Sequence, residues 1–184
     1  MREVVLTDAK GNRTGLSEIV EAHTGKGKLH KAFSVYIFRN KGTEILIQQR
    51  SSEKMLFPLI WANTCCSHPF PEEDVIAAGQ RRLNEECGLE CALQESGTLV
   101  YRAEDPSGNG IEHEHVTLLR GDIDDQSACQ PESAGRRLEP DPDPEEIAEM
   151  RWILLEELLT EMENHPDHYA PWFHLGLKQL LFEL

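Results

Sequence analysis

Two short segments of the sequence carry the side chains best suited to chemistry. Cys66 lies within Asn63-Thr-Cys-Cys-Ser-His-Pro69, and Glu112-His-Glu-His-Val116 follows later in the chain. Residues two apart in a β-strand point to the same face, so Glu112 and Glu114 are expected to direct both carboxylates to one spot. Together with imidazoles upstream, they predict a metal-binding cage with a thiol beside it. The predicted ligands are His23, His30, His68, Glu112 and Glu114.

The predicted ligand set contains nitrogen and oxygen donors and no cysteine, a composition that suits Zn²⁺, Mn²⁺ or Mg²⁺. His113 and His115 alternate with the two glutamates, so we expect them on the other face of the strand, in structural roles. Taken alone, the same pattern is also typical of a half-exposed strand with one polar face.

The bulk composition restricts the class of function. A chain of 184 residues is expected to form one domain, and we assign residues 1–184 to it. The net charge of −15 argues against a nucleic-acid or anionic-membrane partner, because both require basic surface. An anionic ligand therefore needs a local basic pocket. No stretch approaches the ~18 apolar residues of a membrane span, and the N-terminus lacks the apolar core of a signal peptide.

The cysteines indicate the redox compartment. They number five, an odd count without the spacing of a zinc knuckle or a disulfide framework. We therefore expect free thiols in a reducing, cytoplasmic setting. The expected oligomeric state is a monomer or a small homo-oligomer.

Hydrophobic patterning predicts strands, one central helix, further strands and two terminal helices. This order predicts an α/β or α+β sandwich with a mixed sheet flanked by helices. The predicted strands span residues 3–7, 33–38, 44–50, 97–103, 111–120 and 147–154, with a hairpin turn at 40–42. The predicted helices span 16–22, 72–87, 155–164 and 170–182. Residues 124–146 are rich in Pro, Asp and Glu, and we expect an exposed, partly mobile insertion there.

The predicted helix 72–87 resembles the Nudix box, G-x5-E-x7-R-E-U-x-E-E-x-G-U, in which U is aliphatic. On this chain the box begins at Ser67, where the pattern has glycine, places its first acid at Glu73 and ends at Leu89. Arg82 stands where Nudix hydrolases carry an acid that holds divalent metal. A guanidinium there removes a metal ligand and adds a bidentate phosphate donor, which favours holding a diphosphate over hydrolysing it.

The same helix retains one carboxylate for a metal. Glu86 can bind Mg²⁺ together with phosphate oxygens of a substrate. A simpler interpretation is a surface helix with charge pairs, since Arg81 with Glu85 and Arg82 with Glu86 have i,i+4 spacing.

A series of short pieces along the chain resembles the type 1 isopentenyl-diphosphate isomerases, the Nudix-like enzymes of isoprenoid synthesis. The resemblance runs from about residue 3 to residue 175, and the order and gaps of the pieces make it specific. The pieces are Ala22-His-Thr24, Leu29-His30-x-Ala32-Phe33, Gln49-Arg50, Trp61-x-Asn63-x-x-Cys66-x-His68-Pro69, Glu85-Glu86-x-Gly88, Tyr101-Arg-Ala-x-Asp105-Pro, Glu112-x-Glu114 and Pro171-Trp172.

The resemblance implies interconversion of isopentenyl diphosphate and dimethylallyl diphosphate. It implies that Cys66 is the thiol on one face of the double bond and Glu114 the carboxyl on the other, with Tyr101 assisting its proton. The implied ligands of one divalent metal are His23, His30, His68, Glu112 and Glu114, and Glu86 is implied to bind a second metal, Mg²⁺, through the diphosphate. The implied diphosphate clamp is Arg50, Lys54 and Arg82, and the implied aromatic wall is Trp172, with Trp61 as a second candidate.

The reaction explains why these residue types are needed. The alkene is unactivated, so the route is protonation to a tertiary carbocation followed by loss of a proton elsewhere. That route requires an acid and a base on opposite faces of the same carbons. The cation is destroyed by water, and an indole face stabilises it by roughly 2 kcal/mol when desolvated.

Alternatives remain at this point. A Nudix-type diphosphate hydrolase would rest on Glu73, Glu85 and Glu86, and a binding module would keep the cage without the chemistry. Only Cys66 fits the resembling pattern, and Cys65 is expected to be small and buried, but one residue of register would exchange them.

One charge of the resembling family is missing from its usual place. Family members often carry a lysine shortly before the first ligand histidine, where this chain has Ile19 and Val20. Either Lys26, Lys28 or Lys31 supplies that charge, or it is absent.

Overall fold

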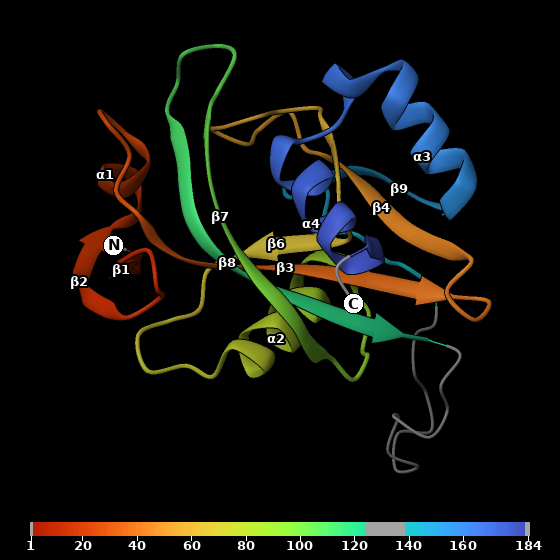
Figure 1. The fold of residues 1–184 in the computed structure, drawn as a ribbon, viewed down its shortest axis with the longest axis horizontal. Helices are drawn as coiled ribbons and strands as arrows, with labels where there is room; N and C mark the ends of the chain where they lie inside the picture. The colour runs from red at the N-terminus through yellow and green to blue at the C-terminus, as the bar shows by residue number, and fades with distance from the viewer. Residues whose placement is uncertain (1, 124–138, 183–184) are drawn as a thin grey trace.

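The computed structural model describes residues 2–123 and 139–182, and the strands within these ranges form one mixed sheet (Figure 1). The strands are β1 (Glu3–Thr7), β2 (Arg13–Glu18), β3 (His30–Arg39), β4 (Glu44–Arg50), β5 (Trp61–Ala62), β6 (Cys65–Ser67), β7 (Gln94–Glu104), β8 (Ile111–Asp122) and β9 (Ile147–Leu154). The helices are α1 (Ile19–His23), α2 (Val75–Cys87), α3 (Leu155–Asn164) and α4 (Pro171–Phe182), with a 3-10 turn, η1 (Pro166–His168), before α4. The predicted α+β sandwich with a mixed sheet is confirmed.

β3 is the central strand, and its neighbours change along its length. On one edge it pairs antiparallel with β1 at His30, with β6 at Phe33–Val35 and with β4 at Ile37–Arg39. On the other edge it pairs in parallel with β8, which makes the sheet mixed. The register sets His30 opposite Glu114, and β7 sets Tyr101 opposite the same glutamate. Three strands therefore deliver side chains to one place.

Two apolar cores lie on the two faces of the sheet, so β3 is buried on both sides. Phe33, Val35 and Ile37 point into the core beneath α2. Tyr36 and Phe38 point into the core that α3 and α4 complete. Figure 1 shows α2 and α4 on opposite sides of the central strands. Burial on both faces explains the near-continuous apolar sequence of this strand.

α2 begins and ends at identifiable residues. Asp74 accepts hydrogen bonds from the N–H groups of Ile76 and Ala77, which fixes the first turn. Gly88 takes a left-handed conformation with φ of +65° and donates back to the helix, as predicted for the C-terminal stop. Gly79 lets the helix approach the sheet closely, because a Cβ there would lie 2.4 Å from Leu119 Cδ1.

Two predictions about secondary structure need correction. The helix predicted over 16–22 starts only at Ile19, because Leu16 and Ser17 continue β2 and pair with β1. The helix predicted over 72–87 starts at Val75, because the Asp74 cap sets its first turn.

The predicted insertion 124–146 also needs correction where it is described. Residues 124–138 lie outside the described residues, but 139–146 are attached to α2. The N–H groups of Asp141 and Asp143 donate to the carbonyl oxygens of Cys87 and Glu86, each over 2.9 Å. This contact satisfies carbonyl groups that every helix leaves open at its C-terminus. It also brings Glu146 to the edge of the cavity described below.

Over the described residues, none of the helices combines the length and the apolar character needed to cross a bilayer.

Candidate active site

A cavity of about 300 Å³ opens at the end of the sheet near α1 and the start of β3. Its lining combines three kinds of side chain from positions far apart in the sequence. The metal-ligand candidates in the lining are His23, His68, Glu112 and Glu114. The basic side chains are Arg2, Arg50, Lys54 and Arg82. Cys66, Tyr101 and Trp172 line the space between them.

Four predicted ligands form one group, which we call the metal cluster: His23, His30, His68 and Glu114. Their ligand atoms all lie within 4.8 Å of one another. His23 ends α1, His30 begins β3, His68 follows β6, and Glu114 lies in β8. The predicted grouping of these four side chains is therefore observed, and it depends on four separate segments of the chain.

The hydrogen bonds of the histidines fit a bound cation. His23 Nδ1 lies 2.7 Å from the carbonyl oxygen of Ile19, and His30 Nδ1 lies 2.7 Å from that of Lys28. A carbonyl only accepts, so both Nδ1 atoms carry a hydrogen, and Nε2 of each ring is the atom that faces the other ligand candidates.

The position of His68 supports the same conclusion. Its Nε2 lies 3.0 Å from His30 Nε2 and 2.9 Å from Glu114 Oε1. One hydrogen cannot serve both neighbours well, whereas a divalent cation at the centre would be held by all of them. The residues present therefore fit a metal ion.

The electrostatics favour the ligating forms of two members. Burial lowers the pKa of His68 to about 4, despite its hydrogen bond to Glu114. Burial opposes the charge of Glu114, but hydrogen bonds from His30 and His68 hold the pKa of that carboxyl well below its usual range. Neutral imidazole and ionised carboxylate are the forms that bind metal.

Glu112 lies beside the metal cluster rather than within it. It shares the inner face of β8 with Glu114, as the alternation predicted, and both carboxylates are buried. Burial opposes the charge of His23, but the carboxylate of Glu112, whose Oε2 lies 3.0 Å from His23 Nε2, raises the pKa of that imidazole to about 9. A fifth donor is thus available next to the other four.

The two adjacent cysteines face different sides. Cys65 is fully buried in the core beneath α2, whereas Cys66 lines the cavity. Arg50 Nη1 lies 3.8 Å from Cys66 Sγ. Burial raises the pKa of the Cys66 thiol to about 12, against the effect of Arg50, so this sulfur stays protonated at neutral pH.

Tyr101 and Trp172 form the wall near Glu114. The Tyr101 hydroxyl donates to Glu114 Oε2 over 2.8 Å. Trp172 Nε1 donates to Asn63 Oδ1 over 3.1 Å, which fixes the indole with its ring centroid 6.0 Å from that of Tyr101. The indole is buried but still lines the cavity.

Trp61, the second candidate for this wall, lies elsewhere. It lines a different hollow with Pro58 and Leu59, and the guanidinium of Arg151 lies 4.7 Å from its ring centroid. Ala62 is buried in the core, whereas Trp61 is only partly buried and packs against that core from outside the cavity.

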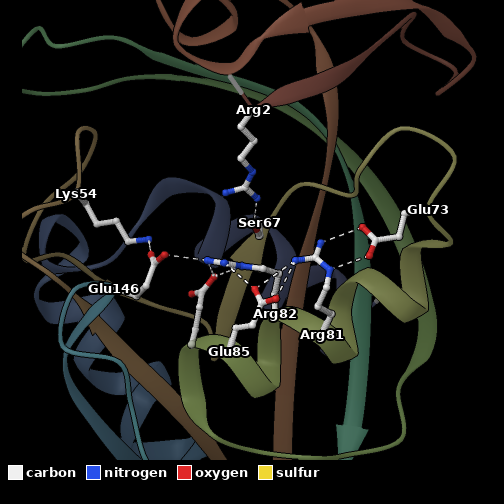
Figure 2. A network of polar contacts seen from close by, with 9 residues as sticks. Arg2, Lys54, Ser67, Glu73, Arg81, Arg82, Glu85 and Glu146 are labelled. Carbon is white, nitrogen blue, oxygen red and sulfur yellow. Dashed lines mark hydrogen bonds and ion pairs between the residues drawn. The ribbon is translucent and has the colours of Figure 1, made fainter.

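The basic end of the cavity contains an ion-pair network, which we call the clamp network: Lys54, Arg82, Glu86 and Glu146 (Figure 2). Arg82 Nε donates to Glu86 Oε1 over 2.9 Å, and Arg82 Nη2 donates to Glu146 Oε1 over 3.0 Å. Lys54 pairs with the other oxygen of Glu146. Burial opposes the charge of Glu146, but Lys54 and Arg82 lower the pKa of that carboxyl to about 2.

Glu86 lies beneath Arg82, with only 1% of its surface exposed, and does not itself line the cavity. Burial raises the pKa of Glu86, against the charge of Arg82. A Mg²⁺ ion bound by Glu86 would therefore require Arg82 to change partners.

The other two acids of the Nudix-like box, Glu73 and Glu85, form ion pairs on the outer side of α2. Arg81 donates to both oxygens of Glu73, over 2.8 and 2.9 Å, and also pairs with Glu85 (Figure 2). Neither Glu73 nor Glu85 lines the cavity. The simpler interpretation, a helix face with charge pairs, describes this side of α2.

Two cavity residues were missed by sequence reasoning. Glu146 is the last residue of an acidic segment that composition marked as surface, and only its position directly before β9 hinted at a fixed side chain. Arg2 lines the cavity, whereas Lys26, Lys28 and Lys31 do not.

Comparisons with known proteins place the chain in a family. Residues 28–173 match the NUDIX domain. An "Isopentenyl-diphosphate Delta-isomerase" of Nocardia farcinica is 41% identical over 169 residues, covering 92% of this chain and 89% of the relative. One of Pectobacterium atrosepticum, with the same description, is 39% identical over 180 residues, covering 98% of this chain and 92% of the relative.

Solved structures show the same fold at low sequence identity. The DR0079 protein of Deinococcus radiodurans has a TM-score of 0.70 at 14% identity, covering 96% of this chain and 98% of the other. A MutT protein of Methanosarcina mazei has a TM-score of 0.59 at 16% identity, covering 84% and 94%. These structures support the fold and say nothing about the reaction.

Proposed function

The chain belongs to the isopentenyl-diphosphate Delta-isomerases of the NUDIX domain family, and on that basis we propose that its cavity interconverts isopentenyl diphosphate and dimethylallyl diphosphate. The observation that carries this proposal is the shared cavity of Cys66, Glu114 and the metal cluster. A thiol and a carboxylate close to one substrate provide the two proton-transfer groups that an allylic isomerisation needs.

Cys66 and Glu114 divide the proton transfers. One group adds a proton to the terminal methylene carbon and leaves the positive charge on the tertiary carbon. The other removes a proton from the neighbouring methylene, and the double bond forms between those two carbons. The reaction is reversible, so each group is an acid in one direction and a base in the other. Tyr101 assists Glu114, because its hydroxyl already donates to Glu114 Oε2.

His23, His30, His68 and Glu114, with Glu112 beside them, would hold one divalent ion, which we propose to be Zn²⁺, Mn²⁺ or Mg²⁺. When bound, such an ion supplies positive charge that perturbs the protonation of Glu114. The chain's own contribution is to fix Nε2 of His23 and His30 through the backbone carbonyl groups behind them.

Trp172 protects the cationic stage of the reaction. Its indole is fixed by Asn63 and packs at right angles to the ring of Phe57, with 5.2 Å between ring centroids. An indole face attracts a carbocation through its quadrupole and leaves no oxygen to trap it. The same apolar wall excludes water from the reacting carbons.

The diphosphate is bound at the basic end. Arg50 is fixed by donating to the carbonyl oxygens of Leu56 and Phe57, over 2.9 and 3.0 Å. Lys54 and Arg82 are paired with Glu146, and we propose that they exchange this carboxylate for phosphate oxygens. Glu86 would hold a Mg²⁺ ion bound to the diphosphate, and that ion would supply positive charge to the phosphate oxygens.

Proton NMR in D₂O tests the proposed reaction. Purified protein is incubated with isopentenyl diphosphate and Mg²⁺, and dimethylallyl methyl signals with deuterium uptake are expected. Release of phosphate instead would indicate the hydrolase alternative, which has less support because Arg82 replaces an acid and Glu73 is bound to Arg81. Metal binding with neither exchange nor cleavage would indicate a binding module.

We also propose a cytoplasmic location. Among the residues that the structure describes, Cys65, Cys66 and Cys87 are free thiols, which is what a reducing compartment preserves.

A further inference from the structure

Arg2 reaches the cavity from a part of the chain in which sequence patterns mark no function. It precedes β1, and its carbonyl oxygen accepts a hydrogen bond from the N–H of Ile19 over 3.0 Å. The next residues pair in register, Glu3 with Glu18. The side chain then extends over the cavity, where Nη2 donates to Ser67 Oγ over 2.8 Å. The start of the chain is thus fixed beside Ile19, where the expected lysine is absent.

The guanidinium of Arg2 has no anionic partner among the residues that the structure describes. Lys54 and Arg82 share Glu146, and Arg81 on the outer face has Glu73. Arg2 has only the neutral hydroxyl of Ser67, although a guanidinium carries five N–H donors. Among the described residues of the cavity, Arg2 is the arginine with most of its donors unused, because Arg50 donates to two carbonyl oxygens and a thiol and Arg82 donates to three carboxylates.

The surroundings of Arg2 favour the binding of an anion. The residue is half-buried, and burial together with the charges of Arg82 and Arg81 lowers its pKa, an effect that Glu86 and Glu146, both paired with Arg82, offset only in part. Cations gathered in a partly desolvated space repel one another unless an anion lies between them. The overall charge of −15 makes such a basic pocket an exception on this protein.

Arg2 and Arg82 approach the same space from different elements. Figure 2 shows Arg2 extending from the N-terminal strands toward Ser67, and Arg82 extending from α2 toward Glu146. An anion between them would accept hydrogen bonds from two guanidinium groups on two sides. Arginine suits this task, because its planar fork matches two phosphate oxygens at once.

We propose that Arg2 binds the substrate's diphosphate and completes the clamp on the side of α1. This inference rests on the proposed function, because it takes the anion to be the diphosphate of the isomerase substrate. Arg2 would then supply the charge for which Lys26, Lys28 and Lys31 were the candidates by sequence. Lys28 is instead used by Glu21 and Ser17.

The substitution Arg2→Met tests the assignment, with Arg2→Lys as the conservative variant. Arg13→Met is the matched control, because Arg13 is exposed on β2 and pairs with Glu72. Steady-state kinetics would measure KM and kcat for isopentenyl diphosphate, and calorimetry would measure the Kd of inorganic diphosphate with Mg²⁺. We expect Arg2→Met to raise both KM and Kd about 10- to 100-fold, the loss of a charged hydrogen bond, with kcat within about threefold. Arg2→Lys should recover part of the loss.

A merely structural role of Arg2 gives a different result. If Arg2 only ties β1 to β6 through Ser67, Arg2→Met lowers Tm and leaves KM and Kd unchanged, and the proposal is overturned. If Arg2→Met fails to fold, Arg2→Gln takes its place, because it removes the charge and keeps a donor for Ser67. Raised KM and Kd in Arg2→Gln would support the proposal, and unchanged KM and Kd would overturn it.

The two proposals can fail separately. Isomerisation by the unsubstituted protein, with normal KM and Kd in Arg2→Met, would reject the role of Arg2 and leave the function standing. No isomerisation, with diphosphate binding that depends on Arg2, would retain the anion site and reject the function.

Discussion

The metal cluster and the clamp network occupy two ends of one cavity and are built in opposite ways. In the metal cluster, short side chains from four segments are fixed by backbone carbonyl groups and strand register. In the clamp network, Lys54 and Arg82 are long side chains whose present partner is Glu146. The first end is preorganised, whereas at the second end Glu146 occupies the two bases that we propose as diphosphate ligands.

The largest expected effects are at the preorganised end. We expect Cys66→Ala and Glu114→Gln each to lower kcat by roughly 10³-fold or more, because each removes a proton-transfer group. Thermal unfolding should change little, and Cys65→Ala serves as the control on the neighbouring thiol. Near-normal kcat in Cys66→Ala would remove the thiol from the mechanism.

The next effect separates metal binding from chemistry. We expect His30→Ala to lower bound metal, measured by elemental analysis after dialysis, by at least about 10-fold, and to lower activity with it. His113→Ala is the control, since His113 lies on the other face of the strand that carries Glu114. Equal metal content in both variants would contradict the assignment of the metal cluster.

A smaller effect is expected at the clamp network, where the substitution should strengthen binding and not weaken it. Glu146→Gln should tighten the binding of inorganic diphosphate without Mg²⁺ by roughly 3- to 10-fold, because the anion no longer competes with a carboxylate for Lys54 and Arg82. Glu145→Gln makes the same change of charge at an exposed neighbour and should leave the Kd unchanged. Weaker binding in Glu146→Gln would show that Glu146 organises the bases instead of occupying them.

The smallest effect is on stability as a function of pH. The folded pKa of Glu146, about 2, is below its ordinary value of 4.5, so its ion pairs contribute fully above about pH 4.5. That contribution is lost as the pH falls from about 4.5 toward 2. With allowance for solvent screening, we expect about 1–2 kcal/mol between the unsubstituted protein and Glu146→Gln at pH 6, measured by urea unfolding. A difference that persists undiminished near pH 2.5 would contradict the pairing.

The same two ends differ in how far the sequence predicted them. The metal cluster was predictable, because alternation along β8 put Glu112 and Glu114 on one face and the resemblance supplied the three histidines. Cys66 was assigned to the site by the same resemblance, which fits Cys66 and not Cys65. Most strands and helices were also predicted, because strong apolar periodicity sets them.

The clamp network was less predictable, because long-range packing decides it. Glu146 belonged to a segment whose composition is typical of solvated surface, yet its neighbours satisfy the last carbonyl groups of α2. Arg2 reaches the cavity only because β1 pairs with β2 and so lies beside Ile19. Trp61 was the second candidate for the aromatic wall, but it lies outside the cavity. A family pattern does not say which way a side chain points, and β5, which carries Trp61, has only two residues.

The pairing of β3 with β8 has a consequence for quality control during folding. A slip of one residue along β8 would turn Glu112 and Glu114 outward and bring His113 and His115 inward. Such a chain could still collapse around apolar side chains, but it would present the wrong donors to His30. Chains with the native register would offer an ion the ligand set of the metal cluster, and binding there would stabilise that register by mass action. Metal binding would therefore act as a check on strand pairing, because it favours the alignment in which Glu114 lies opposite His30.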